Sequence, residues 1–240
     1  MSTLFEQLQE DVRFVEGFNS CMNCGVCTAI CPAAEFYNYD PRIIVDIIQS
    51  RDEEKIESLL RSETIWYCGQ CMSCKIRCPR GNVPGSIIMS LRYLSQKSGY
   101  FTDSEKGRQQ FAVKRTVGDN ILKYGYCIYP DGVIPELHPE QGPVWEWIYQ
   151  HLPDIYDRFD GNYKKDGPGV FRNISEETLR EIKKIFEQTG GQHLYDCIEK
   201  FSEKKADEMG IQFGNGIAND YFYHTYTFNS GKHYRDEQGE

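Results

Sequence analysis

Apolar side chains recur at helical spacing through the first hundred residues of the chain. Within residues 3–18 they stand three or four positions apart, which places them on one face of a helix. Thr3 can cap the start of this helix and Gly17 can end it. The pattern therefore predicts one amphipathic helix over 3–18, with an apolar face made of Leu4, Phe5, Leu8, Val12 and Val15.

Three further helices are predicted before residue 100. Pro41 opens a segment that runs to Ser50, a short acidic segment covers 52–60, and a third covers 86–97 after Pro84 and Gly85. Each segment repeats its apolar residues at the period of a helix. The predicted core faces are Ile43, Ile44, Ile47 and Ile48, then Ile56, Leu59 and Leu60, then Ile87, Ile88, Leu91 and Leu94.

The pattern is less regular after residue 100. Residues 104–123 are predicted to be helical, and 124–170, rich in Pro, Gly and aromatic residues, to form loops with short helical turns. Ser175 can cap a helix to about residue 188, and another helix is predicted over 192–209, ended by Gly210. The core face of the first of these is predicted to be Leu179, Ile182, Ile185 and Phe186.

The last twenty residues, 221–240, alternate roughly at period two and are rich in aromatic side chains, so they are predicted to be a strand or an extended arm on a partner. The patterns together predict a mainly α protein. We expect an α-helical domain in residues 1–100 and a helical, loop-rich extension in residues 101–240, which is the expected partner-docking region.

Charge and hydropathy narrow the class of partner. The formal net charge is −9, with 10 basic and 12 acidic residues in 1–100 against 17 and 24 in 101–240. Nucleic-acid binding needs clustered Lys and Arg, so we expect no nucleic acid as a partner. No apolar run approaches the roughly 18 residues of a membrane helix, and the run over 43–48 is broken by Asp46, so no membrane span is expected.

The compartment is predicted from the cysteines. The chain has ten, and its first residues are acidic and amphipathic rather than those of a secretory or transit peptide. Since disulfide-rich proteins are found in oxidising compartments, ten cysteines without a leader indicate a reducing one. We therefore expect the protein in the cytoplasm.

Eight of the cysteines form two copies of one pattern, C-x2-C-x2-C-x3-C-P, which closes on Pro32 in the first copy and on Pro79 in the second. This spacing is the ferredoxin run for a [4Fe–4S] cluster, and two complete copies predict two [4Fe–4S] clusters and a role in electron transfer. The cysteines are Cys21, Cys24, Cys27 and Cys31 in the first run and Cys68, Cys71, Cys74 and Cys78 in the second.

The fourth cysteine of each run is predicted to serve the other cluster. Three closely spaced thiolates can hold three iron corners of a cubane, but the fourth is turned away by the proline that follows it. The first cluster is therefore assigned to Cys21, Cys24, Cys27 and Cys78, and the second to Cys68, Cys71, Cys74 and Cys31.

Two other uses of these cysteines are weaker. Structural zinc sites pair two C-x2-C knuckles and do not need three thiols at this spacing followed by C-P. Disulfide frameworks belong to small secreted domains. Of the remaining two cysteines, Cys127 and Cys197 are each expected to pack as a small hydrophobic residue.

Further details concern the surroundings of the clusters. Backbone N–H groups of Gly25, Gly69 and their neighbours are expected to donate hydrogen bonds to cluster sulfurs. Gly25 can also be needed for its backbone angles alone.

Trp145 and Trp147 are expected to pack in the core, with interface anchoring as the second interpretation. The chain has no Gly-x-Gly-x-x-Gly sequence and no phosphate loop, and we expect no catalytic site of its own.

The two complete cysteine runs, the helices between them and the segment PRGNVPGSI that precedes the next helix resemble the C subunit of heterodisulfide reductase over residues 1 to about 125. Small bacterial two-cluster ferredoxins instead place β-hairpins between their runs. The broader helical ferredoxin superfamily includes succinate dehydrogenase iron–sulfur subunits, which typically break the pattern for a three-iron cluster. Here all eight ligand positions are cysteine.

The resemblance implies a relay protein within a heterodisulfide-reductase-like complex. In that family it passes electrons between the A subunit, which carries flavin, and the B subunit, which is cysteine-rich and catalytic. The long acidic, aromatic C-terminal part is similar to the versions in sulfur-oxidising complexes. Alternatives are a free-standing ferredoxin-like carrier, an iron–sulfur subunit of another dehydrogenase or fumarate reductase-type complex, and an iron–sulfur sensor.

Overall fold

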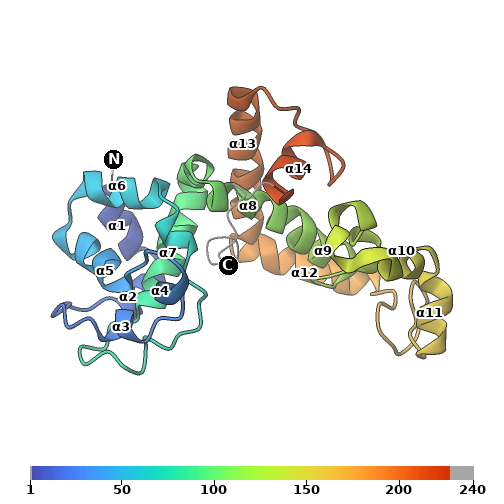
Figure 1. Cartoon of the computed structure of the whole chain (residues 1–240), viewed down its shortest axis with the longest axis horizontal. Coiled ribbons are helices and arrows are strands. Elements are labelled where there is room, and N and C mark those ends of the chain that lie inside the picture. The colour runs from blue at the N-terminus through green and yellow to red at the C-terminus, as the bar shows by residue number, and fades with distance from the viewer. Residues whose placement is uncertain (1, 228–240) are drawn as a thin grey trace, which may run out of the picture. The chain divides into compact units, whose positions relative to one another are not determined.

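The computed structural model describes residues 2–227 and contains helices but no strand within that range. The described chain forms two compact units, one of residues 2–110 with 200–205 and the other of residues 111–199 with 206–227 (Figure 1). The mainly α prediction is therefore confirmed. Among the described residues, no helix has both the length and the apolar content needed to cross a membrane.

Helix α7 (Pro84–Ser98) is the central helix of the first unit. It packs against α1 (Leu4–Gln9), α2 (Val12–Gly17), α5 (Pro41–Ser50) and α6 (Glu53–Arg61). The short helices α3 (Val26–Ala29) and α4 (Ala33–Phe36) follow the first cysteines. The core between these helices is aliphatic and aromatic and includes Leu8, Phe14, Ile44, Val45, Ile48, Ile56, Leu60, Ile65, Ile87, Ile88 and Leu91.

The single helix predicted over 3–18 is wrong, because the chain breaks at Asp11. Thr3 caps α1 as expected, through a capping box with Glu6. Asp11, however, has extended backbone angles, and its carboxylate accepts a hydrogen bond from the Arg13 N–H at 2.9 Å. An aspartate that bonds to the backbone in this way competes with the helix and begins a new one, α2.

The predicted core faces of α6 and α7 are confirmed, since Ile56, Leu59 and Leu60 and the four apolar residues of α7 are buried. In α5 the face is rotated. Ile43 is 51% exposed, whereas Val45 is buried beside Ile44 and Ile48. Because five of its ten residues are aliphatic, the pattern does not fix which face of α5 is buried, and packing against the neighbouring helices decides it.

The second unit begins in a long helical segment. Helix α8 (Glu105–Val113) continues through a π-helical turn (Lys114–Gly118) into α9 (Asp119–Tyr124), so the helix predicted over 104–123 is present with one irregular turn. The region predicted as loops also holds α10 (Gly142–Gln150) and α11 (Leu152–Arg158). Helices α12 (Glu176–Gln188) and α13 (Gly191–Met209) lie within a residue of their predicted bounds, and Ser175 caps α12.

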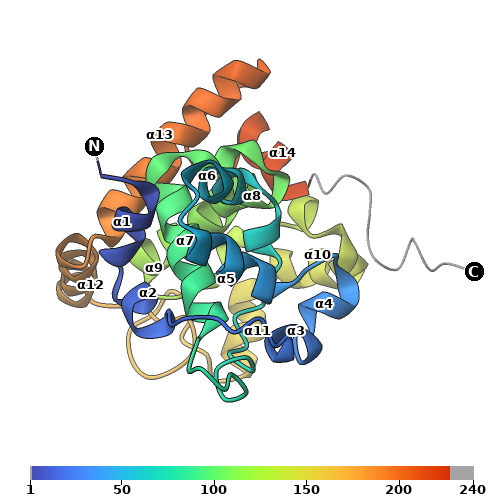
Figure 2. The same ribbon diagram turned by 90° about the vertical axis from the view of Figure 1, so that its left-hand side faces the viewer.

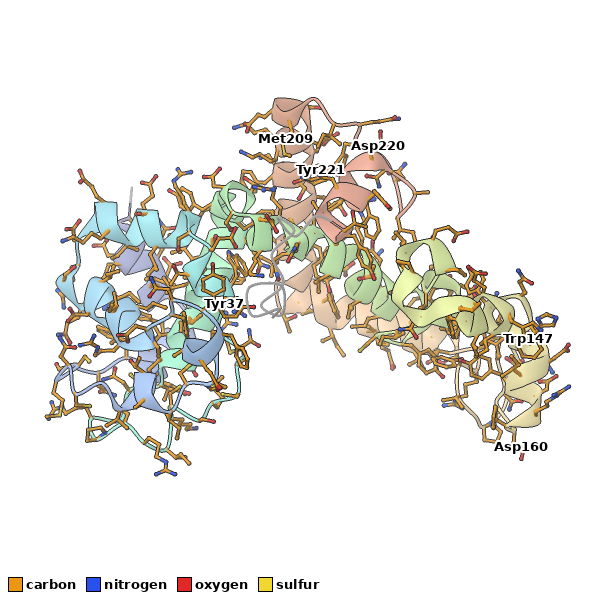
Figure 3. The ribbon with its side chains drawn as sticks, viewed as in Figure 1. Tyr37, Trp147, Asp160, Met209, Asp220 and Tyr221 are labelled. Carbon is orange, nitrogen blue, oxygen red and sulfur yellow. The ribbon has the colours of Figure 1, made fainter. Side chains whose placement is uncertain are left out.

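An aromatic cluster holds the middle of the second unit together. Its buried members are Tyr129, Leu152 and Tyr163, and the Trp145 indole N–H donates to the carbonyl of Val133 at 2.8 Å. This accounts for Trp145, which is half-buried, but Trp147 is 53% exposed and stacks only on His151 at the surface of α10 (Figure 3). The core packing expected for Trp147 is therefore wrong. The partly buried members of the cluster are Tyr124, Tyr126, Trp145, Ile148, Tyr149, Tyr156 and Phe171.

The predicted face of α12 is only partly covered. Leu179, Ile182 and Phe186 are half-buried, whereas Ile185 is 59% exposed. No residue of α12 is fully buried. The expectation of a full core face is therefore wrong for this helix, although its apolar stripe is present as the sequence indicates.

The start of the tail predicted as a strand or an arm is helical. Helix α14 (Asp220–Thr227) buries Tyr221, Phe222 and Thr225, and the Asn219 side chain accepts a hydrogen bond from the Phe222 N–H at 2.8 Å. Positions i, i+1 and i+4 lie on one helical face, and packing of that face overrides the period-two alternation. The rest of the predicted tail, 228–240, lies outside the described residues.

Candidate functional site

The two cysteine loops fold in the same way. Each loop has left-handed residues at the same two places, just before and just after the second cysteine: Asn23 and Gly25 in the first loop, Gln70 and Met72 in the second. In each, the N–H two residues after the first cysteine donates to that cysteine's Sγ at 3.4 Å. These donors are neighbours of the glycines from which hydrogen bonds were expected, and the loops are therefore structural repeats as well as sequence repeats.

The first three cysteines of the first run line one cavity together with the last cysteine of the second run. Cys21 and Cys24 come from the loop before α3, Cys27 lies in α3, and Cys78 comes from the segment before α7. Arg42 of α5 lines the cavity, where its guanidinium is held by Asp40 at 2.9 Å and by Asn23 at 2.8 Å. The other lining residues are Met22, Gly25, Val26, Val45, Arg80, Asn82 and Pro84.

A second cavity has the complementary set of thiols. It is lined by Cys68, Cys71 and Cys74 from the second run and by Cys31, the last cysteine of the first run. The two cavities have similar volumes, about 20 and 30 Å³. The remaining lining residues are Pro32, Ala33, Tyr39, Pro41, Gly69, Met72, Ser73, Pro84, Gly85 and Ile88.

The beginning of α7 separates the two cavities. Pro84 lines both, and in Figures 1 and 2 the loops around α3 and before α7 lie at the same end of the first unit. At Gly85 a Cβ atom would lie 2.9 Å from the Met72 Sδ and 3.8 Å from the Cys74 Sγ. A larger residue at position 85 would require the Met72 side chain to shift, and the backbone N–H of Gly85, at the positive end of the helix dipole, bonds to Cys74.

The thiols differ in their surroundings. Burial raises the pKa of the Cys27 and Cys74 thiols, and hydrogen bonds from Thr28 and from the Gly85 backbone respectively oppose the rise. A hydrogen bond with Ser73 lowers the pKa of the exposed Cys71 thiol. Cys24 is exposed as well, so each cavity has one ligand position open to solvent and others enclosed.

A half-buried arginine is bonded to the backbone of the second cysteine run. Arg92 of α7 donates from Nη2 to the carbonyl of Cys68 and from Nε to the carbonyl of Ile65, both at 2.7 Å, and its guanidinium lies over the Trp66 ring. Burial lowers the pKa of the guanidinium, while the neighbouring Cys68 raises it. A cation at this position favours anionic sulfur next to Cys68.

Tyr39 completes the wall of the second cavity. Its ring packs edge-on against Tyr67, with centroids 6.2 Å apart, and Tyr67 is stacked on Tyr37 at 4.3 Å (Tyr37 is labelled in Figure 3). Burial raises the pKa of the Tyr39 hydroxyl, and the neighbouring Cys68 and Cys31 raise it further. The phenol is therefore a neutral O–H donor beside two thiols.

The donor sets fit cubane iron–sulfur clusters. Each cavity offers four cysteine sulfurs, the number of iron corners on a cubane, and backbone N–H groups already bonded to sulfur. Across residues 2–227, no group of three or more His, Cys, Asp or Glu side chains is arranged to hold a single metal ion. The fit lies in the chemistry of the donor set, four thiols at each cavity, and a bound cluster would supply one-electron redox chemistry.

Three residues beside the cavities were not singled out from the sequence: Tyr39, Asn82 and Arg92. Asn82 stands in the segment PRGNVPGSI, and Arg92 is a charged residue next to the apolar face of a predicted helix. The sequence therefore offered a reason to single out both residues. Tyr39 is eight residues beyond Cys31 in an irregular stretch, and nothing in the pattern distinguishes it from the nearby Tyr37.

The cysteines outside the runs lie elsewhere. Cys127 is exposed, so the expectation that it packs as a small hydrophobic residue is wrong. Cys197 is half-buried on α13, with its Sγ 3.7 Å from the His193 Nε2 one turn earlier. Neither cysteine lines the two thiol cavities.

Known proteins resemble the chain over both units. A family model described as a 4Fe-4S dicluster domain matches residues 17–82, which include both cysteine runs. The C subunit of the ferredoxin:CoB-CoM heterodisulfide reductase of Methanosarcina acetivorans is 31% identical over 212 residues, which cover 88% of this chain and 76% of that protein.

Relatives from other methanogens agree with this match. The C subunit of the H2:CoB-CoM heterodisulfide,ferredoxin reductase of Methanothermobacter marburgensis is 29% identical over 174 residues, covering 72% of this chain and 76% of that protein. The iron-sulfur C subunit of the CoB–CoM heterodisulfide reductase of Methanopyrus kandleri is 28% identical over 142 residues, covering 58% and 72% respectively. The chain is a protein of two [4Fe–4S] clusters and belongs to the C-subunit family of heterodisulfide reductase iron–sulfur proteins.

Proposed function

We propose that the two clusters are ligated across the two cysteine runs and pass electrons between them. Cys21, Cys24, Cys27 and Cys78 hold one cluster, and Cys68, Cys71, Cys74 and Cys31 hold the other. The observation that supports this ligand set most directly is that the fourth cysteine of each run lines the cavity of the other run. The shared Pro84 wall keeps the two clusters close enough for short-range electron transfer.

The chain is an electron relay with no substrate chemistry of its own. By analogy with the family, its electron donor and acceptor are the flavin-bearing A subunit and the cysteine-rich, catalytic B subunit. Cys24 and Cys71 are exposed, one in each loop, so each cluster has an edge that a partner can approach. This arrangement suits entry of an electron at one cluster and exit at the other.

Residues from about 101 onwards form the partner-docking part of the chain. This assignment is supported by the exposed Trp147 on α10 and the half-covered apolar stripe of α12, which are surfaces of the kind that bind proteins. A diffusing carrier does not need this second unit. Ten free cysteines suit the reducing cytoplasm, where we place the complex.

The terminal substrate belongs to the assembly. The named relatives are parts of CoB–CoM heterodisulfide reductases. A sulfur-oxidising complex is the second candidate, proposed only from the length and the acidic, aromatic character of the C-terminal part. The relay is the same in both cases, and identification of the catalytic protein that co-purifies with the chain distinguishes them.

The ligand set is tested by changing Cys78 to Ser in the anaerobically isolated protein. Because Cys78 lines the cavity of the first run, Cys78→Ser is expected to alter the EPR spectrum of the cluster held by Cys21, Cys24 and Cys27. Cys127→Ser, which changes an exposed cysteine outside both cavities, is the matched control and is expected to leave both clusters unchanged. Damage restricted to the cluster of Cys68, Cys71 and Cys74 would show that the runs do not cross.

The relay role is tested by gel filtration of native extract. A relay that works within a complex is expected to elute with flavin-containing and cysteine-rich partners, and mass spectrometry identifies them. A free-standing carrier would instead elute near its chain mass of 27.9 kDa. That result would remove the complex from the proposal while leaving the two clusters in place.

A further inference from the structure

Each thiol cavity contains one buried side-chain donor that has no partner at full hydrogen-bond geometry. The Asn82 side chain is 2% exposed and lines the first cavity, and Tyr39 is 4% exposed and lines the second. Within residues 2–227, the Asn82 Nδ2 has no hydrogen-bond partner, and the Tyr39 hydroxyl has none at full hydrogen-bond geometry, although it interacts with the neighbouring Cys68 thiol. A buried donor left unsatisfied destabilises the fold, so a donor at such a position normally has a reason to be there.

The Asn82 side chain is held at the wall of the first cavity by its amide oxygen. Its Oδ1 accepts a hydrogen bond from the Asn19 backbone N–H at 2.8 Å. The Asn19 side chain in turn donates to the carbonyl of Gly81 at 3.3 Å. This pair of bonds fixes the turn between Cys78 and α7 and uses the acceptor of Asn82, which leaves the donor for the cavity.

Tyr39 is held just as firmly at the second cavity. Its ring lies edge-on to Tyr67, with an interplanar angle of 89°, and Tyr67 is stacked on Tyr37. The hydroxyl lies at the end of this aromatic stack, beside Cys68 and Cys31. The ring cannot turn away without breaking the stack, so the O–H group stays at the cavity wall.

Other buried polar atoms that lack a hydrogen-bond partner do not lie at a thiol cavity. The Trp66 indole nitrogen and the Ser202 hydroxyl are also buried without a hydrogen-bond partner in the described chain, but they line neither thiol cavity. What distinguishes Tyr39 and Asn82 is the coincidence of a fixed donor with a four-thiol wall, one for each cavity. The Tyr39 hydroxyl lies beside the Cys68 and Cys31 thiols, and Asn82 lines its cavity together with four cysteines.

We propose that Tyr39 and Asn82 each donate a hydrogen bond to a sulfur of the cluster in their cavity and thereby raise its reduction potential. The inference rests on the proposed ligand set. Reduction adds one electron to a cluster and no bond is made or broken, so the added negative charge is spread over the sulfurs. A donor to sulfur stabilises the more negative form more strongly, which is the effect that hydrogen bonds have on cluster potentials.

The test is an anaerobic redox titration of the full chain with EPR detection, with dithionite as reductant. Tyr39→Phe removes only the hydroxyl and keeps the stacked ring. It is expected to leave about eight iron atoms per chain and to lower the potential of one cluster. At a fixed ambient potential the ratio of reduced to oxidised cluster should fall about tenfold, which is about 59 mV for one electron.

The matched control is Tyr37→Phe, the same chemical change on the partly exposed outer ring of the stack, which lines neither cavity. It is expected to leave both potentials at the wild-type values. Unchanged potentials in a Tyr39→Phe protein with its full iron content would overturn the inference and leave the proposed function intact. Wild-type protein without two four-iron clusters would instead contradict the proposed function itself.

Asn82→Asp is the independent test at the other cavity. The carboxylate keeps an acceptor for the Asn19 N–H but has no donor when it is ionised, at about pH 8. The potential of the other cluster, the one unaffected by Tyr39→Phe, is expected to fall. Asn19→Asp places the same charge at a nearby exposed position and is expected to have a much smaller effect. Equal shifts in the two aspartate variants would show that charge alone acts and would overturn the role of the Asn82 donor.

Discussion

In the second unit the buried Arg115 guanidinium has a partner at each of its nitrogens, whereas in the first unit the buried Tyr39 hydroxyl and the Asn82 Nδ2 have no partner in hydrogen-bond geometry among the described residues. Arg115 pairs through Nε and Nη2 with Glu199, at 2.7 and 2.6 Å, and its Nη1 donates to the carbonyls of Gly214 and Gly216. This one side chain joins the π-helical turn, α13 and the loop before α14.

The difference shows which unit satisfies its buried polar groups with protein atoms alone. The second unit satisfies its buried charge with its own carboxylate and carbonyls. The first unit presents thiols and unpaired donors to two cavities and therefore depends on the inorganic group for part of its cohesion. Stability and iron content should accordingly be linked in the first unit and independent in the second.

Removal of the clusters should have the largest effect. Because ligand binding is folding free energy when the site is built from loops, iron removal is expected to cost the first unit roughly 10 kcal/mol, by analogy with structural zinc sites. Hydrogen exchange measured by mass spectrometry after anaerobic treatment with a chelator should show loss of protection across 17–82. Residues 111–199 should keep theirs.

Two other results of this hydrogen-exchange experiment would contradict the difference between the units. If protection were lost equally in both units, the second unit would depend on the clusters as well. If neither unit lost protection, the cysteine loops would be stable without metal, and the unpaired donors would need another explanation.

Glu199→Gln should have the next largest effect, and only in the second unit. The substitution leaves the buried Arg115 without a counter-charge, which costs about 3–5 kcal/mol in comparable pairs. Chemical denaturation measures the loss, and the iron content should stay at the wild-type value. Glu57→Gln, which breaks the exposed pair with Arg61, is the matched control and should cost under about 1 kcal/mol.

Lowering the pH should weaken the Arg115–Glu199 pair in the wild-type protein, without a mutation. Burial raises the pKa of Glu199, but hydrogen bonds from Arg115 and Lys114 outweigh it, and the net pKa is lowered. A carboxylate with a lowered folded-state pKa stabilises the protein above its unfolded-state pKa of about 4.3 and loses that contribution as the pH falls further. The wild-type protein should therefore lose more stability below about pH 4.3 than the Glu199→Gln variant does; equal losses would contradict the assignment.

Gly25→Ala should have the smallest effect. Gly25 has φ +77°, and a Cβ added there would have no atom within 4 Å, so the cost is only that of a left-handed alanine, about 1–2 kcal/mol. Met72 occupies the equivalent left-handed position in the second loop with φ +59°. Met72→Gly is therefore expected to reduce strain where Gly25→Ala adds it, and thermal denaturation of the cluster-loaded protein compares the two. A neutral Gly25→Ala would show that the loop changes its backbone.

The sequence indicated those features that depend on local spacing. The capping box at Thr3, the Ser175 cap and the apolar faces of α6 and α7 all follow from residues within a turn or two of each other. The eight cysteines were predicted as cluster ligands for the same reason. The break at Asp11 was also local, but Asp11 stands between two good helical patterns that conceal it.

Features that depend on the tertiary fold could not be predicted. Tyr39, Asn82 and Arg92 reach the thiol cavities only because α5 and α7 and the turns before them pack against the cysteine loops. Their residue types are common elsewhere in the chain. The helical conformation of 220–227 likewise depends on the burial of Tyr221 and Phe222, which outweighs the alternating pattern.

The central claim is tested most directly by metal and sulfide analysis of the anaerobically purified chain, combined with EPR of the reduced protein. About eight iron atoms and eight sulfides per chain are predicted, with the signals of two interacting four-iron clusters. Stoichiometric zinc, or about four iron atoms with the signal of a single cluster, would contradict the account.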